Sequence, residues 1–386
     1  MALVGIDASR AVSLRPTGTE TYSRRLIQAL LDLDTPHRFR LYFRAPPPAG
    51  DFAAADRRVI PFPRLWSHVR LSWEIARRPP DLLFVPAHVL PIIHPRRSVV
   101  TVHDLGYLHF PRAHPLRQRL YLDLSTRWSA RAAAHLLADS QATKADLVAR
   151  YRTPPEKVTV AYPGSDESLS PVRDPAAIAA AKARYGIRGD YFLYLGTLQP
   201  RKNLATLIAA FAALQPETLK PETALVIAGQ KGWLYHDLFD PVRRLGLEGR
   251  VCFPGYVAEA DKAALLSGAL AFVFPSLYEG FGLPVLEAQA CDCPVVCANT
   301  SSLPEVAGDS ALLVAPTDAA ALTAALARLA GDPSLRADLV ERGRTNLRRF
   351  SWERCARTVL DVIAGLVGRT GFQPVPQAGN PSHGSR

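Results

Sequence analysis

The stretch Phe274-Pro-Ser-Leu-Tyr-Glu-Gly-Phe-Gly-Leu-Pro-Val-Leu-Glu287 places two carboxylates, Glu279 and Glu287, on either side of a Gly-Phe-Gly loop. An apolar run over 269–274 precedes the loop, and Pro284 stands where the first turn of a helix should begin. This order of strand, glycine loop and helix start brings free backbone N–H groups and the positive end of a helix dipole to one point. It therefore predicts an anion-binding site at the carboxyl end of a strand.

The two glutamates are expected to have different roles at this site. Glu279 lies in the loop, where glycine lets a ligand approach the backbone, and Glu287 is expected in the first helical turn. A carboxylate accepts pairs of hydrogen bonds, which suits the neighbouring hydroxyl groups of a sugar or a ribose. The alternative is that Glu279 is a solvated loop charge and that Glu287 only complements the helix dipole.

Length and composition set bounds on the class of protein. The chain of 386 residues is too long for one ordinary core, and with 48% hydrophobic and 21% charged residues it is globular. We expect no signal peptide and no membrane-spanning segment, and the five cysteines, without Cys-x-x-Cys spacing, indicate reduced thiols in a cytoplasmic protein. The net charge of +11 suits an anionic lipid surface, a diphosphate or nucleic acid, unless it reflects a generally arginine-rich composition.

Apolar runs and amphipathic stretches alternate in a pattern that predicts an α/β fold with two doubly wound parallel sheets. Strands are expected in the first half at 3–8, 39–44, 58–62, 81–87, 98–103, 135–139 and 158–161. Strands are expected in the second half at 191–195, 224–228, 251–253, 269–274, 294–298 and 312–315. The predicted divisions are domains at 1–170 and 171–350, a final helix at 351–368 and a disordered tail at 369–386.

Two candidate sites of the first half lie at expected strand ends, where parallel sheets bind their ligands. Gly18 and Thr19 stand between a strand and a helix and form a candidate phosphate cradle, although any tight turn would use a glycine there. His103 ends the strand at 98–103, where its ring would orient or polarise an acceptor hydroxyl or the transferred group. Asp104 would orient the ring, and the alternative is a structural histidine.

Between residues 64 and 78, Trp66, Val69 and Trp73 recur at helical spacing among four arginines. A basic helix that carries tryptophans can lie on an anionic membrane surface and present a lipid-linked acceptor. The alternative is a helix that packs its aromatic stripe on its own sheet while its arginines are solvated. The charge of the whole chain favours the membrane interpretation.

Arg201 and Lys202 stand at the expected N-terminus of a helix over 204–214, where cationic side chains are unfavourable for the helix dipole. Their position is explained if an anion, such as a nucleotide diphosphate, lies between them and the helix. The alternative is that both side chains extend into water. On the first interpretation this basic pair and the acidic pair, Glu279 and Glu287, converge on one ligand.

The Glu-x7-Glu spacing, with Tyr-Glu-Gly-Phe-Gly-Leu-Pro over 278–284, resembles the donor-site signature of the family 4 retaining glycosyltransferases, and the likeness covers about 1–365. The resemblance implies the GT-B fold, with the acceptor on the first domain, the nucleotide sugar on the second, and the last helix crossing back to the first. It implies catalytic roles for His103, Arg201, Lys202 and Glu279. It implies substrate-binding roles for Gly18, Thr19, Tyr256, Gly280, Phe281, Gly282, Leu283 and Glu287. The family's common arginine is replaced by Leu198, and Arg201 is the substitute that we expect.

The segment 196–203 and the tryptophan-rich region resemble most the mannosyltransferases of surface polysaccharide assembly, with GDP-mannose as the favoured donor. No Asp-x-Asp pair is suited to a metal, and we expect neither a metal nor a cofactor besides the nucleotide sugar. Expected partners are the nucleotide sugar, a glycan or lipid-linked acceptor and an anionic membrane surface at which a cytoplasmic enzyme acts peripherally. A nucleotide-sugar epimerase of the same fold and a noncatalytic nucleotide or nucleic-acid binder are the alternatives, but no nucleic-acid motif is present.

Overall fold

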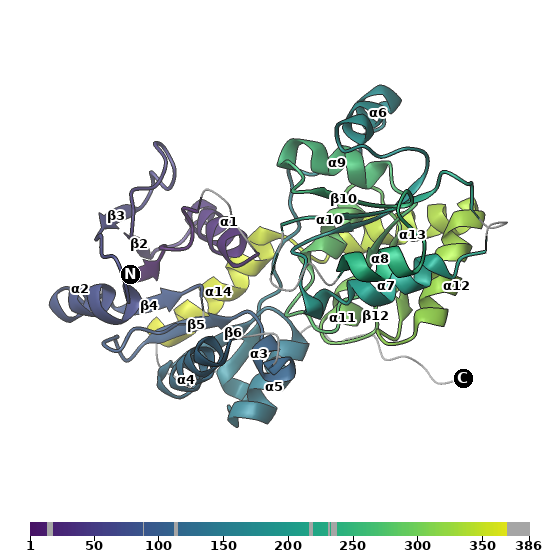
Figure 1. The fold of residues 1–386 in the computed structure, drawn as a ribbon. Coiled ribbons are helices and arrows are strands. Elements are labelled where there is room, and N and C mark those ends of the chain that lie inside the picture. Colours follow the sequence, from purple (N-terminus) through teal and green to yellow (C-terminus); the bar gives the residue numbers. More distant parts are fainter. Residues whose placement is uncertain are drawn as a thin grey trace, which may run out of the picture.

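The computed structural model describes residues 1–13, 18–87, 89–111, 115–215, 219–230, 232 and 238–368. Within these residues the chain forms two parallel sheets flanked by helices, which make two lobes (Figure 1). The fold class expected from the sequence, α/β with two doubly wound domains, is confirmed. The tail at 369–386, which we expected to be disordered, lies outside the described residues.

The described part of the N-terminal lobe contains a seven-stranded sheet in the order β3-β2-β1-β4-β5-β6-β7. Its strands are β1 (Leu3–Asp7), β2 (Arg38–Phe43), β3 (Asp56–Val59), β4 (Leu82–Val85), β5 (Ser98–Val102), β6 (His135–Ala138) and β7 (Val158–Val160). Its helices are α1 (Gly18–Asp32), α2 (Ser72–Arg77), α3 (Gly106–His109), α4 (Leu116–Ala132) and α5 (Gln141–Tyr151). A π-helical turn at Ser67–Leu71 leads directly into α2.

The described part of the C-terminal lobe contains a six-stranded sheet in the order β10-β9-β8-β11-β12-β13. Its strands are β8 (Tyr191–Leu195), β9 (Ala224–Ala228), β10 (Val251–Gly255), β11 (Ala271–Phe274), β12 (Val295–Ala298) and β13 (Ala311–Val314). Its helices are α6 (Pro175–Arg184), α7 (Leu204–Ala212), α8 (Phe239–Arg244), α9 (Glu259–Ser267), α10 (Leu283–Ala290), α11 (Leu303–Ala307), α12 (Ala319–Gly331) and α13 (Pro333–Leu347).

In each sheet the strand order reverses between two neighbours, β1 and β4 in the first sheet and β8 and β11 in the second. The loops that follow such a pair leave adjacent strand ends in opposite directions, which opens a crevice between them. In the second sheet one of these loops carries Arg201 and Lys202, and the other carries Glu279. This topology brings together side chains that are far apart in the sequence.

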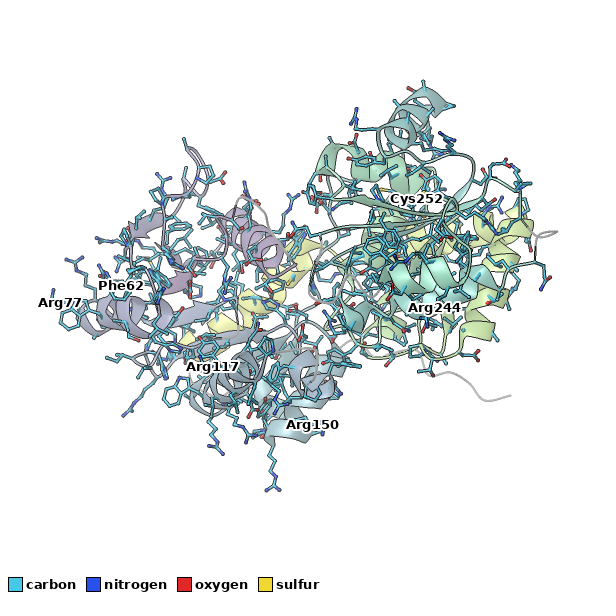
Figure 2. The ribbon with its side chains drawn as sticks, viewed as in Figure 1. Phe62, Arg77, Arg117, Arg150, Arg244 and Cys252 are labelled. Carbon is cyan, nitrogen blue, oxygen red and sulfur yellow. The ribbon has the colours of Figure 1, made fainter. Side chains whose placement is uncertain are left out.

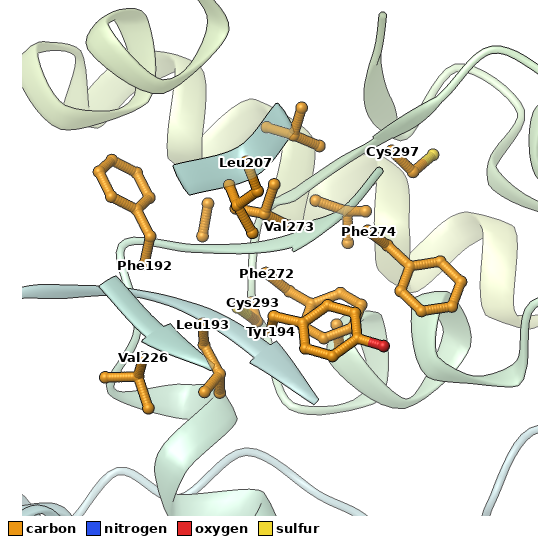
Figure 3. Close-up of a cluster of buried hydrophobic side chains, with 14 of the residues drawn as sticks. Phe192, Leu193, Tyr194, Leu207, Val226, Phe272, Val273, Phe274, Cys293 and Cys297 are labelled. Atoms are coloured by element: carbon orange, nitrogen blue, oxygen red, sulfur yellow. The ribbon is translucent and has the colours of Figure 1, made fainter. Parts of the chain in front are cut away.

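The strands are apolar at successive positions because helices cover both faces of each sheet. Phe192, Leu193 and Tyr194 of β8 are fully buried, and so are Phe272 and Phe274 of β11. Figure 3 shows side chains of these two strands in one buried cluster. The core formed by β8 and β11 beneath the crevice is therefore densely packed, and this packing holds the ends of the two strands in place.

The last helix, α14 (Trp352–Val367), returns from the C-terminal lobe and packs on α1. Trp352, Val359 and Ile363 are buried in the same cluster as Leu26 of α1 and Ile6 of β1. In Figure 1 this helix, drawn in yellow, lies among the purple and blue elements of the N-terminal lobe. The first core is thus completed by residues from the other end of the chain.

The segment 64–78 differs from the single helix that we expected. Trp66 lies before the π-helical turn, is buried, and donates its indole N–H to the Ile60 carbonyl oxygen at 2.7 Å. Val69 and Trp73 are 47% and 55% exposed. Trp66 therefore packs inside the protein, as in the alternative to membrane binding, whereas Val69 and Trp73 present apolar surface to solvent.

We expect Trp352→Ala to lower the free energy of unfolding by about 3–5 kcal/mol, because it removes the buried aromatic ring at the start of α14. Urea denaturation measures the loss. The control is Trp73→Ala, which removes a tryptophan that is 55% exposed and should change stability by only about 0.5 kcal/mol. Similar losses in the two variants would contradict the importance of the α14 contact.

Candidate active site

The loop between β11 and α10 is shaped by its two glycines. Gly282 has a φ of +117°, which favours glycine. A Cβ at position 280 would lie 2.1 Å from the carbonyl oxygen of His103, so Gly280 is what lets the loop approach the N-terminal lobe. The predicted order of strand, glycine loop and helix is present. Because α10 begins at Leu283, however, Glu287 lies in its second turn and not in the first.

Two serines beyond the end of β12 hold this loop. The Glu279 N–H donates to Ser301 Oγ at 2.9 Å, and the fully buried Ser302 Oγ lies 2.6 Å from the carbonyl oxygen of Phe281. Sequence reasoning missed both serines in this role. The signal that would have found them is their position just after β12, the strand that pairs with β11.

Glu279, Arg201 and Lys202 form a buried charge cluster at the mouth of the crevice. Lys202 Nζ lies 2.5 Å from Glu279 Oε1, and Arg201 Nη1 lies 3.1 Å from Glu279 Oε2. Burial alone would raise the pKa of Glu279, but the charges of Arg201 and Lys202 outweigh burial and lower the pKa to about 2. Glu279 is therefore ionised at neutral pH.

Two cations share one carboxylate in this cluster. Burial lowers the pKa of the Lys202 ammonium, and the neighbouring Arg201 acts in the same direction against the charge of Glu279. Asp104, which also lines the cavity, adds a second negative charge that acts on both cations. The guanidinium and the ammonium together carry several N–H donors, which are suited to a bound anion such as a phosphate group.

Glu287 faces the cavity together with a lysine. Lys262 Nζ, from α9, lies 3.4 Å from the Glu287 carboxylate and 2.8 Å from that of Glu259. Burial raises the pKa of Glu287, with a smaller contribution from the charge of Glu259. Glu287 is thus part of an ion-pair network and is not a solvated helix charge.

On the N-terminal lobe, His103 follows β5 and its two ring nitrogens contact the protein. Nδ1 lies 2.7 Å from Asp139 Oδ2, and Nε2 lies 3.0 Å from the carbonyl oxygen of Pro86. Burial lowers the pKa of His103, but the Asp139 charge outweighs it, so that the pKa is raised. An imidazolium donates at both nitrogens, which matches two acceptors.

The partner of the His103 ring corrects one expectation. Asp139 holds the ring, whereas the carboxylate of Asp104, which we expected to orient it, accepts the Gly106 N–H at 2.9 Å. Asp139 was missed because it is 36 residues away in the sequence. It could have been found from the sheet, because β5 and β6 are paired and both residues directly follow their strands.

A cavity of about 470 Å³ lies between the lobes, and every site residue predicted from the sequence lines it. From the N-terminal lobe these are Gly18, Thr19 and His103. From the C-terminal lobe they are Arg201, Lys202, Tyr256, Glu279, Gly280, Phe281, Gly282, Leu283 and Glu287. The structure thus brings the predicted residues together, while their chemical roles stay predictions.

The lining residues differ in how far they reach solvent. Tyr256 is 58% exposed, whereas Phe281 is buried against the rings of Tyr162 and Phe350. Leu198, at the position of the family's common arginine, is also buried. Among the described residues, no group of three or more His, Cys, Asp or Glu side chains is placed to hold a metal ion.

Comparisons with known proteins agree with this fold and site. A family model described as Glycosyltransferase Family 4 matches residues 16–169, and one described as Glycosyl transferases group 1 matches residues 180–346. The O-antigen chain mannosyltransferase B of Escherichia coli is 34% identical over 266 residues, which are 69% of this chain and 69% of that protein. A D-inositol 3-phosphate glycosyltransferase of Salinispora tropica is 34% identical over 251 residues, covering 61% of this chain and 52% of the relative.

Solved structures share the fold over nearly the whole chain. Sucrose-phosphate synthase from Thermosynechococcus elongatus has a TM-score of 0.74 at 21% identity, covering 95% of this chain and 99% of its own. HepE of Anabaena, in complex with UDP and glucose, has a TM-score of 0.72 at 21% identity, and the match covers 94% of this chain and 99% of HepE. The two sheets and the cleft between them are those of a GT-B glycosyltransferase. The chain belongs to the family 4 glycosyltransferases and is an enzyme of the hexosyltransferase type.

The charge cluster predicts a pH dependence of stability. The pKa of Glu279 is about 2 in the folded protein, below its ordinary value of 4.5, so its ionised form stabilises the fold above about pH 4.5. This contribution, roughly 3 kcal/mol, is lost as the pH falls from 4.5 towards 2. Glu279→Gln should lack this loss and be less stable than the wild type at pH 7, because it leaves two buried cations without a counter-charge.

Denaturant unfolding at a series of pH values measures this difference. The control is Glu353→Gln, because the Glu353 side chain is 64% exposed and its ion pair with Arg357 lies at the surface. Parallel pH curves for the wild type and Glu279→Gln would contradict a strongly lowered pKa.

Proposed function

We propose that the protein transfers a mannosyl group from GDP-mannose to a lipid-linked saccharide, with retention of the anomeric configuration. The observation that supports the proposal is the pair of cationic side chains, Arg201 and Lys202, that meets Glu279 at the wall of the cavity between the lobes. The mannosyl group is supported by O-antigen chain mannosyltransferase B and by serotype-specific mannosyltransferase WbdA of Escherichia coli, the latter 30% identical over 195 residues. Retention is supported by the resemblance to the family 4 retaining glycosyltransferases.

The basic pair would act on the leaving group. As the bond between the anomeric carbon and the diphosphate breaks, negative charge grows on the diphosphate, and donors already aimed at it lower the barrier. Arg201, Lys202, Gly282 and Leu283 line the cavity, and the two side chains and the N–H groups at the start of α10 would perform this task. The acceptor oxygen bonds to the anomeric carbon on the same face, and its proton passes to the departing phosphate oxygen.

The two glutamates would bind hydroxyl groups of the donor. Glu279 has its backbone held by Ser301 and its carboxylate held by two cations, so it presents a fixed acceptor to the sugar. Glu287 is placed further along α10 and would accept the hydroxyl groups of the ribose. His103 would orient the acceptor hydroxyl or the transferred sugar from the other lobe, and a bond from its Nε2 would require release of Pro86.

A second hollow, of about 570 Å³, is the site that we propose for the acceptor. It lies at the carboxyl ends of β1 to β3 and is lined by Arg10, Arg44, Phe62 and Glu20, among others. Glu20 directly follows Thr19, which lines the donor cavity. We assign this hollow to the saccharide of the acceptor.

Lys202→Ala should bind and turn over the donor poorly, because Glu279 then keeps only Arg201 and one of the two cations that would hold the diphosphate is lost. Wild-type enzyme incubated with a panel of nucleotide sugars should gain thermal stability most with GDP-mannose, and Lys202→Ala should not. Transfer to a lipid-linked acceptor should fall at least about a hundredfold in the variant.

The matched control is Lys182→Ala, because Lys182 is a half-buried lysine that packs on Tyr191 outside the cavity. It should keep both donor binding and transfer. Stabilisation by another nucleotide sugar would reassign the donor, and undiminished transfer by Lys202→Ala would contradict the role of the basic pair.

We also propose that the enzyme works at an anionic membrane surface. Large apolar side chains are exposed on three segments of the N-terminal lobe, and the most exposed, Leu65, Trp73, Ile92, Leu116 and Leu124, are between 55% and 64% exposed. We call this face the apolar surface. A contiguous exposed patch of this kind marks an interaction site.

The three segments are neighbours in space. His68 Nε2 lies 3.2 Å from the Tyr121 hydroxyl, which joins the turn before α2 to α4. The Ile93 N–H donates to Ser72 Oγ at 3.2 Å, which joins the loop after β4 to α2. These two contacts place the three segments that carry the apolar surface next to one another.

The charge of this face favours anionic lipid over a protein partner. Segments 62–97 and 115–132 contain ten arginines, no lysine and three acidic residues. Figure 2 shows Phe62, Arg77 and Arg117 on the N-terminal lobe, with Arg77 at the left edge of the molecule. Exposed apolar side chains in arginine-rich segments suit the boundary between acyl chains and anionic headgroups. Among the described residues, no helix is long and apolar enough to cross a bilayer.

Trp73→Glu combined with Leu124→Glu should weaken binding to vesicles that contain phosphatidylglycerol by at least about tenfold, measured by co-sedimentation. Leu245→Glu is the control, because Leu245 is 46% exposed but lies on the C-terminal lobe. Equal binding of the two variants would contradict the proposal. So would a wild-type dimer in sedimentation velocity that only the double variant disrupts, because the surface would then join two copies of the chain.

A further inference from the structure

The loop that carries Glu279 is in contact with both lobes. On its own lobe, the Tyr278 carbonyl oxygen accepts a hydrogen bond from Arg201 Nη1. On the opposite lobe, Thr143 Oγ1 lies 3.3 Å from the carbonyl oxygen of Gly280. The position of Glu279 therefore depends on how the lobes meet.

The side chain of Tyr278 crosses between the lobes. Its hydroxyl donates to Asp146 Oδ2 of α5 at 2.7 Å and accepts the Leu105 N–H at 3.3 Å. His109 Nε2 lies 2.9 Å from the same Asp146 oxygen, and its ring stacks on the Tyr278 ring at 4.6 Å between centroids. Asp146, His109 and Leu105 all belong to the N-terminal lobe, whereas Tyr278 belongs to the donor loop.

The Tyr278 side chain is buried, and its phenol group keeps its proton. Tyr278 is 5% exposed, and burial, together with the charges of Asp146 and Asp104, raises the pKa of its hydroxyl far above neutral pH. The Tyr278 hydroxyl therefore keeps its proton at neutral pH and can donate it to Asp146. A hydrogen bond to a charged acceptor is stronger than one between neutral groups.

The contact lies beside the cavity but outside it. Asp104 and Glu279, which adjoin Leu105 and Tyr278 in the sequence, are among the residues that line the cavity. Among the described residues, Tyr278, Asp146 and His109 are not part of that lining. These three side chains therefore leave room for the donor and act on it only through the loop. Their role is to connect the donor loop to the N-terminal lobe.

We propose that Tyr278, with Asp146 and His109, forms a latch that closes the donor loop onto the acceptor lobe and makes Tyr278 a positioning residue for Glu279. The latch holds the Glu279 carboxylate and His103 at a set separation while donor is bound. Release of the latch lets the lobes part so that the nucleotide exchanges. If the closed form is the one that binds donor well, the apparent donor affinity falls in proportion to the closed fraction.

Glu305 makes another contact between the lobes. Glu305 of α11 accepts the N–H groups of Gln141 and Ala142 at 2.9 and 3.0 Å, at the N-terminus of α5. Asp146 lies on the same helix, so both contacts draw α5 towards the C-terminal lobe. Among the residues described here, the donor loop is joined to α5 both by the Tyr278 hydroxyl on Asp146 and by Thr143 Oγ1 on the Gly280 carbonyl oxygen, and the first of these contacts uses a side chain of the loop.

Tyr278→Phe tests the latch because it removes the hydroxyl and keeps the stacked ring. In the ligand-free enzyme, small-angle X-ray scattering should show a larger radius of gyration than in the wild type, and a saturating nucleoside diphosphate should reverse the change. The donor KM should rise about tenfold, which corresponds to about 1.4 kcal/mol, while kcat stays unchanged.

The matched control is Tyr107→Phe. Tyr107 is also a buried tyrosine, but its hydroxyl contacts Thr126 at 2.8 Å and Tyr151 at 2.7 Å within the N-terminal lobe. This variant should lose thermal stability with no change in the radius of gyration or the donor KM. A merely structural role for Tyr278 would give the same result as this control and would overturn the proposal.

The scattering comparison does not require turnover. It therefore tests the latch even if the donor differs from the one proposed above, and only the KM measurement rests on the proposed function. An unchanged radius of gyration in Tyr278→Phe refutes the latch whatever the donor is. A larger radius of gyration in Tyr278→Phe supports the latch. If the wild-type enzyme at the same time transfers no sugar from any nucleotide sugar, the proposed function is contradicted while the latch stands.

Discussion

The neutralisation of buried charge at one point controls the geometry of the C-terminal lobe. Lys202 and Arg201 follow β8, Glu279 follows β11, and neither loop can move without leaving an ion unpaired. Breaking such a pair typically costs about 3–5 kcal/mol, which is a large part of the stability of an ordinary domain. The need to pair these ions therefore sets the width of the crevice between the two strand ends, and it does so before any ligand arrives.

The meeting of the two lobes depends on backbone as much as on side chains. Gly280 brings its loop so close to the His103 carbonyl oxygen that no side chain fits between them. Glu305 reaches the first N–H groups of α5, which a helix end leaves without partners of its own. The donor half and the acceptor half are thus aligned by short polar contacts, which separate at less cost than a continuous apolar interface would.

Most of the fold and much of the cavity could be predicted from the sequence, because long apolar runs identify parallel strands and strand ends identify ligand sites. That reasoning located Lys202, Glu279 and His103. It could not locate Asp139 or Ser302, because their roles depend on which strands are neighbours, and strand order is not written in local periodicity. It also grouped Trp66 with Trp73, because helical spacing does not reveal that a π-helical turn and a hydrogen bond to Ile60 direct the Trp66 side chain inwards.

The return of α14 to the N-terminal lobe has a consequence for synthesis on the ribosome. Strand β1 and helix α1 are made first, yet the cluster that buries them includes Trp352 and Ile363 from the end of the described chain. The C-terminal lobe has its sheet within 191–314 and its buried cluster within 181–350, so all of that lobe is synthesised before the residues of α14 that complete the first core. Vectorial synthesis thus leaves the first-made half exposed the longest, and a chain shortened before residue 352 would retain that exposed apolar surface permanently.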